Sequence, residues 1–149
     1  MSIDYRLTLA GPTPVEQVAA RAFTEPAERP TGTVPRLFAA LQEEYGFDVT
    51  VYAGKDGYLD AASDNGQWEW EPEAYVSVTF TLDKSADRDR AVENLSAVVR
   101  RILITGAEDA AFDLNGDILL FTRFDGALVK HNRDSWWSRH AAADQLIPG

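Results

Sequence analysis

The sequence has no cysteine among its 149 residues, and it contains only two histidines and one methionine. Without cysteine the chain can form neither a disulfide nor a thiolate metal site, and a reducing compartment suits it. His131 and His140 alone are too few for an imidazole-rich metal site. The sequence therefore predicts a protein without a metal and without a cofactor.

Long apolar runs are missing as well. No stretch approaches the roughly 18 consecutive apolar residues expected of a membrane-spanning helix. The first twenty residues carry Asp4, Arg6 and Glu16 around short apolar pieces, where a secretory leader would have one uninterrupted apolar segment. We therefore expect a cytoplasmic protein with no membrane partner.

Basic residues are scarce relative to acidic ones, with 14 Lys and Arg against 24 Asp and Glu and a formal net charge of −10. The excess lies in residues 1–74, which hold 13 acidic and 5 basic residues. Such a charge disfavours binding to the phosphates of nucleic acids and to anionic membranes. It serves solubility, or it attracts a basic protein partner.

What is present is typical of a globular core: 45% hydrophobic and 11% aromatic residues, in a chain whose length suits one domain over residues 1–149. Period-two alternation and turn residues predict strands and hairpins. The predicted strands cover 3–9, 47–53, 58–61, 67–71, 75–82, 109–114, 117–124 and 127–131, with 47–53 and 58–61 joined as a hairpin.

Helices are predicted at three places. Thr13-Pro14-Val15-Glu16 has the spacing of a capping box and begins the first. Ser85 can cap the second, whose apolar stripe predicts packing on a sheet. That stripe comprises Val92, Leu95, Val98, Val99, Ile102 and Leu103. Residues 35–45 favour a short helix ended by Gly46, with a strand over 36–41 as the alternative.

The tail from 133 to 147 contains Trp136 and Trp137 and is predicted to form a short helix or a docked coil over an edge of the core. Its basic residues next to two tryptophans superficially suggest a surface for stacking nucleic-acid bases, but the net charge argues against it. We expect Arg133 and Arg139 to pair with the acidic half of the domain instead, while the tryptophans pack. The fold class predicted is α+β, a single domain with a largely antiparallel sheet and two or three helices packed on one face.

Catalytic patterns are absent from the sequence. It has no Gly-x-Ser-x-Gly elbow and no glycine-rich phosphate loop. Asp113, Asn115 and Asp117 imitate the start of a calcium loop, but Ile118 and Phe124 stand where glycine and glutamate are required. The sequence therefore predicts a protein that is not an enzyme. A hydrolase or transferase that uses carboxylates with either histidine stays an alternative, favoured if a carboxylate lies within hydrogen-bond reach of an imidazole.

The segment from Gln67 to Tyr75 alternates tryptophan with glutamate. If it is extended, Trp68 and Trp70 point to one side and Glu69 and Glu71 to the other. One interpretation is a sheet edge with indoles inside and carboxylates in water; the other is an acidic, aromatic recognition edge. On the second interpretation the candidate partner-binding residues are Asp60, Asp64, Trp68, Glu69, Trp70, Glu71 and Glu73.

Several motifs together resemble the Sit-type immunity proteins, which accompany contact-delivered bacterial polymorphic toxins. They are Ile3-Asp4-Tyr5-Arg6-Leu7-Thr8-Leu9-Ala10 with Thr13-Pro14-Val15-Glu16, Tyr45-Gly46-Phe47, Trp68-Glu69-Trp70-Glu71-Pro72-Glu73-Ala74-Tyr75-Val76-Ser77-Val78-Thr79-Phe80, Val98-Val99-Arg100-Arg101, Asn115-Gly116-Asp117, Arg123-Phe124-Asp125-Gly126 and the closing Ile147-Pro148-Gly149. The resemblance implies a cytoplasmic protein that neutralises a cognate toxin by binding it.

Our leading hypothesis is a stoichiometric inhibitor that offers an acidic surface to a basic toxin domain. The main alternative is a regulatory or scaffold domain that self-associates through exposed tryptophans or binds a small ligand. An uncharacterised hydrolase is the third.

Overall fold

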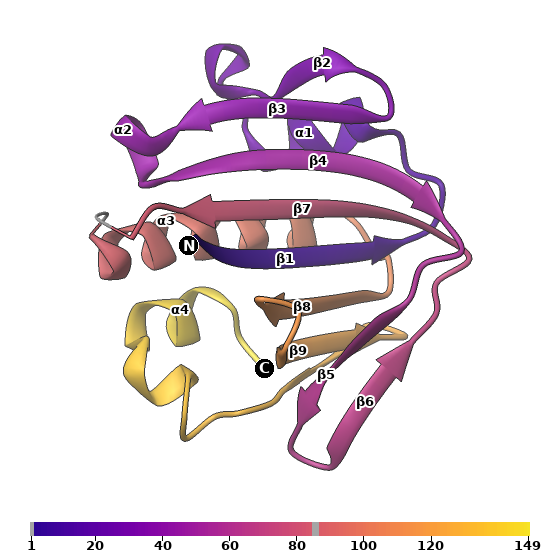
Figure 1. The fold of residues 1–149 in the computed structure, drawn as a ribbon, viewed down its shortest axis with the longest axis vertical. Coiled ribbons are helices and arrows are strands. Elements are labelled where there is room, and N and C mark those ends of the chain that lie inside the picture. The colour runs from indigo at the N-terminus through magenta and orange to yellow at the C-terminus, as the bar shows by residue number, and fades with distance from the viewer. Residues whose placement is uncertain (1, 85–86) are drawn as a thin grey trace.

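One large sheet organises the computed structural model, which describes residues 2–84 and 87–149. Its strands are β1 (Ile3–Ala10), β2 (Thr31–Thr33), β3 (Arg36–Leu41), β4 (Phe47–Lys55), β5 (Leu59–Ser63), β6 (Gly66–Trp70), β7 (Ala74–Leu82), β8 (Ala110–Leu114), β9 (Ile118–Phe124) and β10 (Ala127–Lys130). They lie in the order β2-β3-β4-β7-β1-β8-β9-β5-β6, with β10 paired to β9 (Figure 1). Every pairing is antiparallel except a single parallel bridge between β5 and β9.

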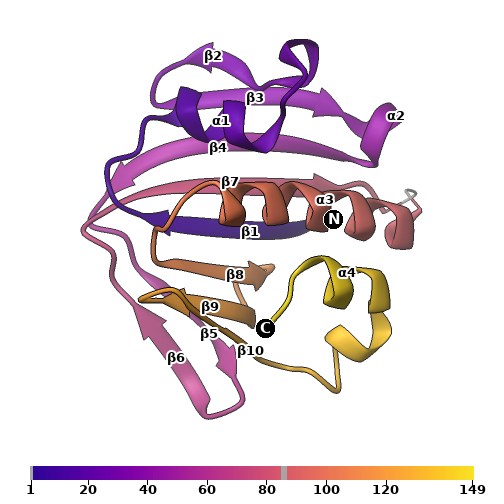
Figure 2. The same ribbon diagram turned by 180° about the vertical axis from the view of Figure 1, so that it is seen from behind.

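The helices are α1 (Val15–Ala22), α2 (Gln42–Tyr45), α3 (Arg88–Ile104) and α4 (Ala141–Leu146), with short 3₁₀ turns at Pro26–Glu28 and Trp137–Arg139. Figure 2 shows α1 and α3 lying across the same face of the sheet, while α4 covers the end near β8 to β10. The whole predicted stripe of α3 is buried. The predicted α+β fold, with a mostly antiparallel sheet and helices on one face, is therefore confirmed.

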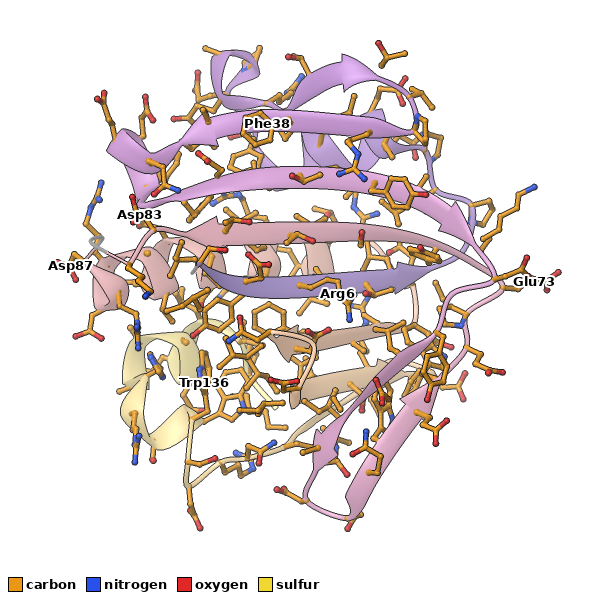
Figure 3. The ribbon with its side chains drawn as sticks, viewed as in Figure 1. Arg6, Phe38, Glu73, Asp83, Asp87 and Trp136 are labelled. Carbon is orange, nitrogen blue, oxygen red and sulfur yellow. The ribbon has the colours of Figure 1, made fainter. Side chains whose placement is uncertain are left out.

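The two faces of the central strands differ in polarity because their side chains alternate. On β1, Tyr5, Leu7 and Leu9 are buried in the main core together with the apolar faces of α1 and α3. Arg6, labelled in Figure 3, points to the opposite face, which no helix covers in the described part of the chain. Thr8, two residues further along the strand, lies on the same face. We call this surface the open face.

The C-terminal segment docks as predicted. The side chains of Trp136 and Trp137 are buried, and their rings meet edge to face with centroids 4.8 Å apart. The Trp137 Nε1–H donates to the carbonyl oxygens of Leu120 and His131 at 2.9 and 3.1 Å. These bonds satisfy the one polar atom of a large buried side chain.

The structure contains one long hairpin that the sequence did not predict, running from β4 through β5 and β6 to β7. The prediction that β4 and β5 pair with each other is wrong. Instead β4 pairs with β7 and β5 with β6, and the register is continuous from Lys55↔Ala74 to Leu59↔Trp70. The predicted turn at Asp64-Asn65-Gly66 closes the ribbon. Local turn residues near 54–57 therefore mark a bend and not a chain reversal.

The bend lies where Gly57 faces Pro72, and the Gly57 N–H donates to the Pro72 carbonyl at 2.9 Å. A Cβ at Gly57 would lie 2.9 Å from Cδ1 of Tyr75 and 3.1 Å from Cγ of Pro72. Only glycine lets the two strands stay this close while they leave the plane of the sheet. Past the bend, β5 and β6 cross the open side of the molecule at an angle to β4 and β7 (Figure 1).

The predicted start of the first helix needs correction. The capping box is wrong: Pro14 occupies the N-cap position without a side-chain bond, and the Thr13 hydroxyl donates to Glu108 Oε2 at 3.1 Å. The Thr13 hydroxyl thus bonds to a carboxylate far away in the sequence, and not to the backbone of its own helix. The predicted cap at Ser85 lies outside the described residues. Among the described ones, Asp87 is the N-cap of α3, and its side chain accepts from the Arg90 N–H.

Residues 36–41 form a strand, so the favoured helix over 35–45 is wrong and the alternative is right. Pairing of β3 with β4 over Arg36↔Tyr52 to Leu41↔Phe47 overrides the helical spacing of the apolar residues. Only the last four residues are helical, and Gly46 ends them in the left-handed conformation with φ 92°, as predicted.

The expected pairing of Arg133 and Arg139 with the acidic half of the domain is also wrong. In the described part of the chain the ion pairs are Arg6–Asp113, Arg21–Glu108 and Lys130–Asp144. Arg133 donates instead to the Gly149 carbonyl at 2.8 Å. The cation that does pair with the C-terminal segment is the buried ammonium of Lys130, which bonds to Asp144. It lies 4.4 Å from the Trp137 ring centroid.

Candidate functional site

The inner side of the β5–β6 hairpin carries both predicted tryptophans. Trp68 lies opposite Ala61 and Trp70 opposite Leu59, and both indoles are half-buried. They pack on a small apolar cluster of Ala61, Ala111 and Leu119, while the Trp70 ring meets Phe124 edge to face at 5.4 Å. The indoles therefore fasten the hairpin to the sheet, as the sheet-edge interpretation requires.

The outer side of the same hairpin is acidic. Asp60 lies directly opposite Glu69, and both carboxylates are exposed. The Tyr58 hydroxyl donates to Glu69 Oε2 at 3.0 Å, and this bond, with the neighbouring carboxylates, raises the pKa of Tyr58. Like charges directly opposite each other destabilise a strand pair by a few tenths of a kcal/mol to about 1 kcal/mol.

Glu71 and Glu73 continue the acidic side past the end of β6 and are exposed. Figure 3 places Glu73 at the bend, pointing away from the molecule. Within residues 2–84 and 87–149, none of the three ion pairs includes Asp60, Glu69, Glu71 or Glu73. We call these four residues the acidic hairpin surface. Its charge is not neutralised by any described lysine or arginine.

Asp64 has a different role from the other predicted acidic residues. It lies at the hairpin tip, where its Oδ1 accepts from the Asn132 N–H at 3.0 Å. The Asn132 side chain in turn donates to the carbonyl oxygens of Ala62 and Leu119 at 3.2 and 2.7 Å. Asp64 and Asn132 therefore tie the tip of the hairpin to the chain that follows β10.

The two histidines make local contacts. His131 Nδ1 accepts from the Asp64 N–H at 3.3 Å, and His140 Nδ1 lies 3.0 Å from the Trp136 carbonyl oxygen. Neither imidazole makes a hydrogen bond or an ion pair to a carboxylate among the residues that the structure describes. The pair that would have favoured a hydrolase is therefore not found there.

Asp113 and Asn115, two of the three residues that imitate a calcium loop, make contacts within the protein; Asn115 Oδ1 accepts from the Asp4 N–H at 2.9 Å. Asp113 is almost fully buried and accepts from Arg6 Nε at 3.1 Å and from the Gly116 N–H at 2.9 Å. In the part of the chain that is described, no group of three or more His, Asp or Glu side chains is placed to hold a metal.

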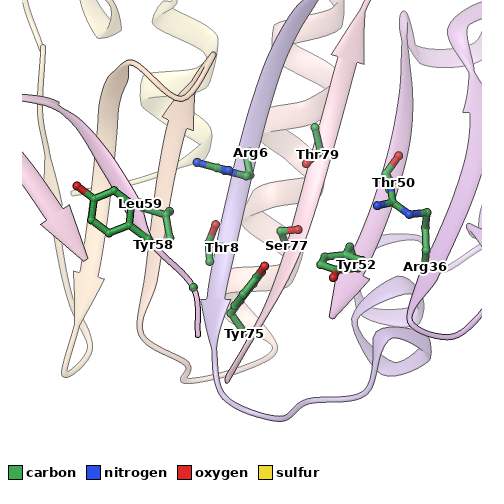
Figure 4. A pocket seen from close by; sticks show the side chains of 11 residues that line it. Arg6, Thr8, Arg36, Thr50, Tyr52, Tyr58, Leu59, Tyr75, Ser77 and Thr79 are labelled. Atoms are coloured by element: carbon green, nitrogen blue, oxygen red, sulfur yellow. The ribbon is translucent and has the colours of Figure 1, made fainter. Parts of the chain in front are cut away.

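Sequence reasoning missed a pocket of about 280 Å³ on the open face. Its hydroxyl-bearing lining from the central strands comprises Thr8, Thr50, Tyr52, Tyr75, Ser77 and Thr79. Arg6 and Arg36 stand on opposite sides, and Tyr58 closes the pocket from the hairpin bend (Figure 4). The alternation of each strand marked these positions as facing away from the core. It carried no sign that β3, β4, β7 and β1 lie side by side.

The carboxyl of Asp113, which lies opposite Arg6 on the neighbouring strand β8, offers a test of the charge balance beside this pocket. Burial raises its pKa above the ordinary 3.8, and the Arg6 guanidinium opposes that rise. Because the folded pKa exceeds the unfolded one, the contribution of this group favours folding below the unfolded pKa and is lost as the pH rises through the folded pKa.

We expect a carboxyl ¹³C NMR titration to give Asp113 a pKa above 3.8, and Arg6→Gln to raise it further. Arg100→Gln, which removes an exposed arginine of α3, is the matched control and should leave the titration of Asp113 unchanged. A pKa for Asp113 at or below 3.8 in the parent protein would contradict the burial effect.

The comparison with known families agrees with the resemblance in the sequence. The SitI3-like family model matches residues 3–141, and the chain belongs to that family. Membership confirms the predicted relation to the Sit-type immunity proteins and points to an immunity-type protein. No curated protein and no solved structure gives a significant match. None of the described helices is both long and apolar enough to cross a membrane.

Proposed function

We propose that this protein is a cytoplasmic immunity protein that neutralises a toxin by stoichiometric binding, without catalysis. The acidic hairpin surface contacts a basic region of the toxin. Family membership supports the immunity role. One observation supports the hairpin as the contact surface: Asp60 and Glu69 are exposed carboxylates that lie directly opposite each other on β5 and β6. Neither takes part in any of the described ion pairs.

The concentration of charge favours binding over solubility as its purpose. A chain with a net charge of −10 is soluble without placing two carboxylates opposite each other, an arrangement that weakens the hairpin. A basic partner would relieve that repulsion on contact. A surface of one sign also speeds encounter with a partner of the other sign.

The hairpin also presents these carboxylates on a firm support. Trp68 and Trp70 hold its inner side against the sheet, and Asp64 holds its tip through Asn132. A surface that is already ordered loses little conformational entropy when a partner binds. On this proposal the tryptophans position the acidic residues, and direct contact of the indoles with the partner stays a prediction.

Charge reversal tests the proposal. The triple variant Glu69→Lys, Glu71→Lys and Glu73→Lys is compared with Glu16→Lys, Glu25→Lys and Glu93→Lys, which reverses three exposed glutamates on the helical side by the same amount. A partner recovered from the native host at low and moderate salt is the analyte. We expect the hairpin triple to reduce the association rate constant by about tenfold or more, and the control triple to change it far less.

The measurement is surface plasmon resonance at several salt concentrations, because rim charges act mainly on association and the effect weakens with salt. Equal rate constants for the two triple variants would rule out the hairpin as the contact surface. Recovery of no basic partner under either salt condition would count against the proposed function itself.

A further inference from the structure

The pocket on the open face has walls from two sources. Its floor belongs to β3, β4, β7 and β1, and its roof to Gly57, Tyr58 and Leu59 at the hairpin bend. The ribbon views show that α1 and α3 lie behind this part of the sheet (Figures 1 and 2). The bend of the long hairpin is thus what turns an otherwise flat sheet surface into a concave site.

Two rows of polar side chains cross the floor. Ser77 lies between Tyr52 and Thr8 in one row, because it pairs with both. In the other row Thr79 lies between Thr50 and Arg6 in the same way. Such rows expose hydroxyls from neighbouring strands about 5 Å apart.

The hydroxyls in the first row are not used by the fold. Thr8 and Ser77 line the pocket, and neither side chain makes a hydrogen bond to any described residue. Neither hydroxyl is sealed from the pocket. Both can therefore donate to, or accept from, a molecule bound there.

The guanidinium group of Arg36 also lines the pocket, beside these hydroxyls. The Arg36 guanidinium carbon lies 5.0 Å from the Tyr52 ring centroid, and within the described chain its N–H groups have no acceptor. Arg6, on the other side, uses Nε for Asp113. Stacking on an aromatic ring holds a guanidinium in place while leaving its donors free for an oxyanion.

We propose that this pocket binds a small hydroxylated oxyanion of the sugar-phosphate class. Arg36 binds the anionic group, and the hydroxyls of Thr8, Ser77 and Tyr52 bind the hydroxylated body. Hydroxyl groups can donate and accept, which suits a polyol, whereas the planar guanidinium suits phosphate. The volume of about 280 Å³ fits a ligand at the small end of those that proteins bind in pockets.

This site shares no residue with the proposed toxin contact, because none of Asp60, Glu69, Glu71 and Glu73 lines the pocket. The two meet at Tyr58, which lines the pocket and donates its hydroxyl to Glu69. Ligand binding here would be an activity in addition to the binding of a protein partner. The two proposals can therefore fail independently, and each has its own set of variants.

Titration calorimetry of the whole chain with ribose 5-phosphate, ribose and inorganic phosphate tests the inference. We expect saturable binding of ribose 5-phosphate, tighter than binding of either ribose or phosphate alone. Arg36→Gln should weaken it by about tenfold or more, since hydrogen bonds to a charged group are lost. Ser77→Val, which replaces a floor hydroxyl with a residue favoured in strands, should weaken it too.

Arg100→Gln supplies the control for net charge, because Arg100 is exposed on α3, an element that contributes nothing to the pocket lining. An equal loss of affinity in Arg36→Gln and Arg100→Gln would overturn the site. The site would also be overturned if neither ribose 5-phosphate nor inorganic phosphate bound saturably. Phosphate bound as tightly as ribose 5-phosphate would overturn the sugar-phosphate class. Thermal unfolding of each variant confirms that the fold is retained.

Discussion

Replacing Trp137 by alanine is expected to lower the free energy of unfolding by about 3–5 kcal/mol. The indole is 2% exposed and fills the space between the sheet and the C-terminal segment. Its loss leaves a cavity and removes the ring beneath the Lys130 ammonium. It also removes the only described side-chain donor to the Leu120 and His131 carbonyls.

Urea unfolding followed by far-UV circular dichroism measures the effect. Trp137→Phe is the matched variant: it keeps an aromatic ring in the space but lacks the Nε1–H, so we expect a smaller loss. A loss below about 1 kcal/mol for the alanine variant would mean that the C-terminal segment contributes little to the core.

Replacing Arg21 by methionine is expected to cost about 2–4 kcal/mol at neutral pH. Its guanidinium bonds both carboxylate oxygens of Glu108 at 2.6 and 3.0 Å and donates to the Ile102 carbonyl at the end of α3. Both side chains are largely shielded from water, with exposed fractions of 16% and 13%. The variant leaves a partly buried carboxylate without its cation.

The cost should depend on pH in a defined direction. The hydrogen bond from Arg21 lowers the pKa of Glu108 below the ordinary 4.5. A group with a lowered folded pKa contributes stability above its unfolded pKa and loses it as the pH falls through the folded pKa. The difference between parent and variant should therefore shrink as the pH falls below about 4.

Denaturant unfolding at a series of pH values measures this difference. Arg101→Met is the matched control, because Arg101 donates to the Ala22 carbonyl and has no carboxylate among the described ion pairs. Its smaller cost should stay constant with pH. An Arg21→Met difference that is the same at pH 3 as at pH 7 would show that the ion pair does not stabilise the fold.

Elements whose signals are local were predictable. The stripe of α3 appears at its predicted positions, and the turns at Asp64-Asn65-Gly66 and Asn115-Gly116 close the hairpins β5–β6 and β8–β9. The turns need backbone conformations that only a few residue types adopt readily, such as asparagine and glycine. The residues next to each other along the chain are therefore enough to predict them.

Where a remote partner competes, local signals failed. Thr13 gives its hydroxyl to Glu108 and not to its own helix, and residues 36–41 join a strand despite helical spacing. The acidic side of the hairpin followed from alternation in 67–71. The direct opposition of Asp60 and Glu69 followed only from the register of β5 with β6.

The amino-acid sequence by itself determined the absence of thiol chemistry, the negative charge, and which side chains share a face of each strand, because alternation is a local property of extended backbone. Only the tertiary structure decided which strands are neighbours. Strand order depends on packing between distant segments, and it alone brings Thr8, Ser77, Tyr52 and Arg36 into one pocket beneath the bent hairpin.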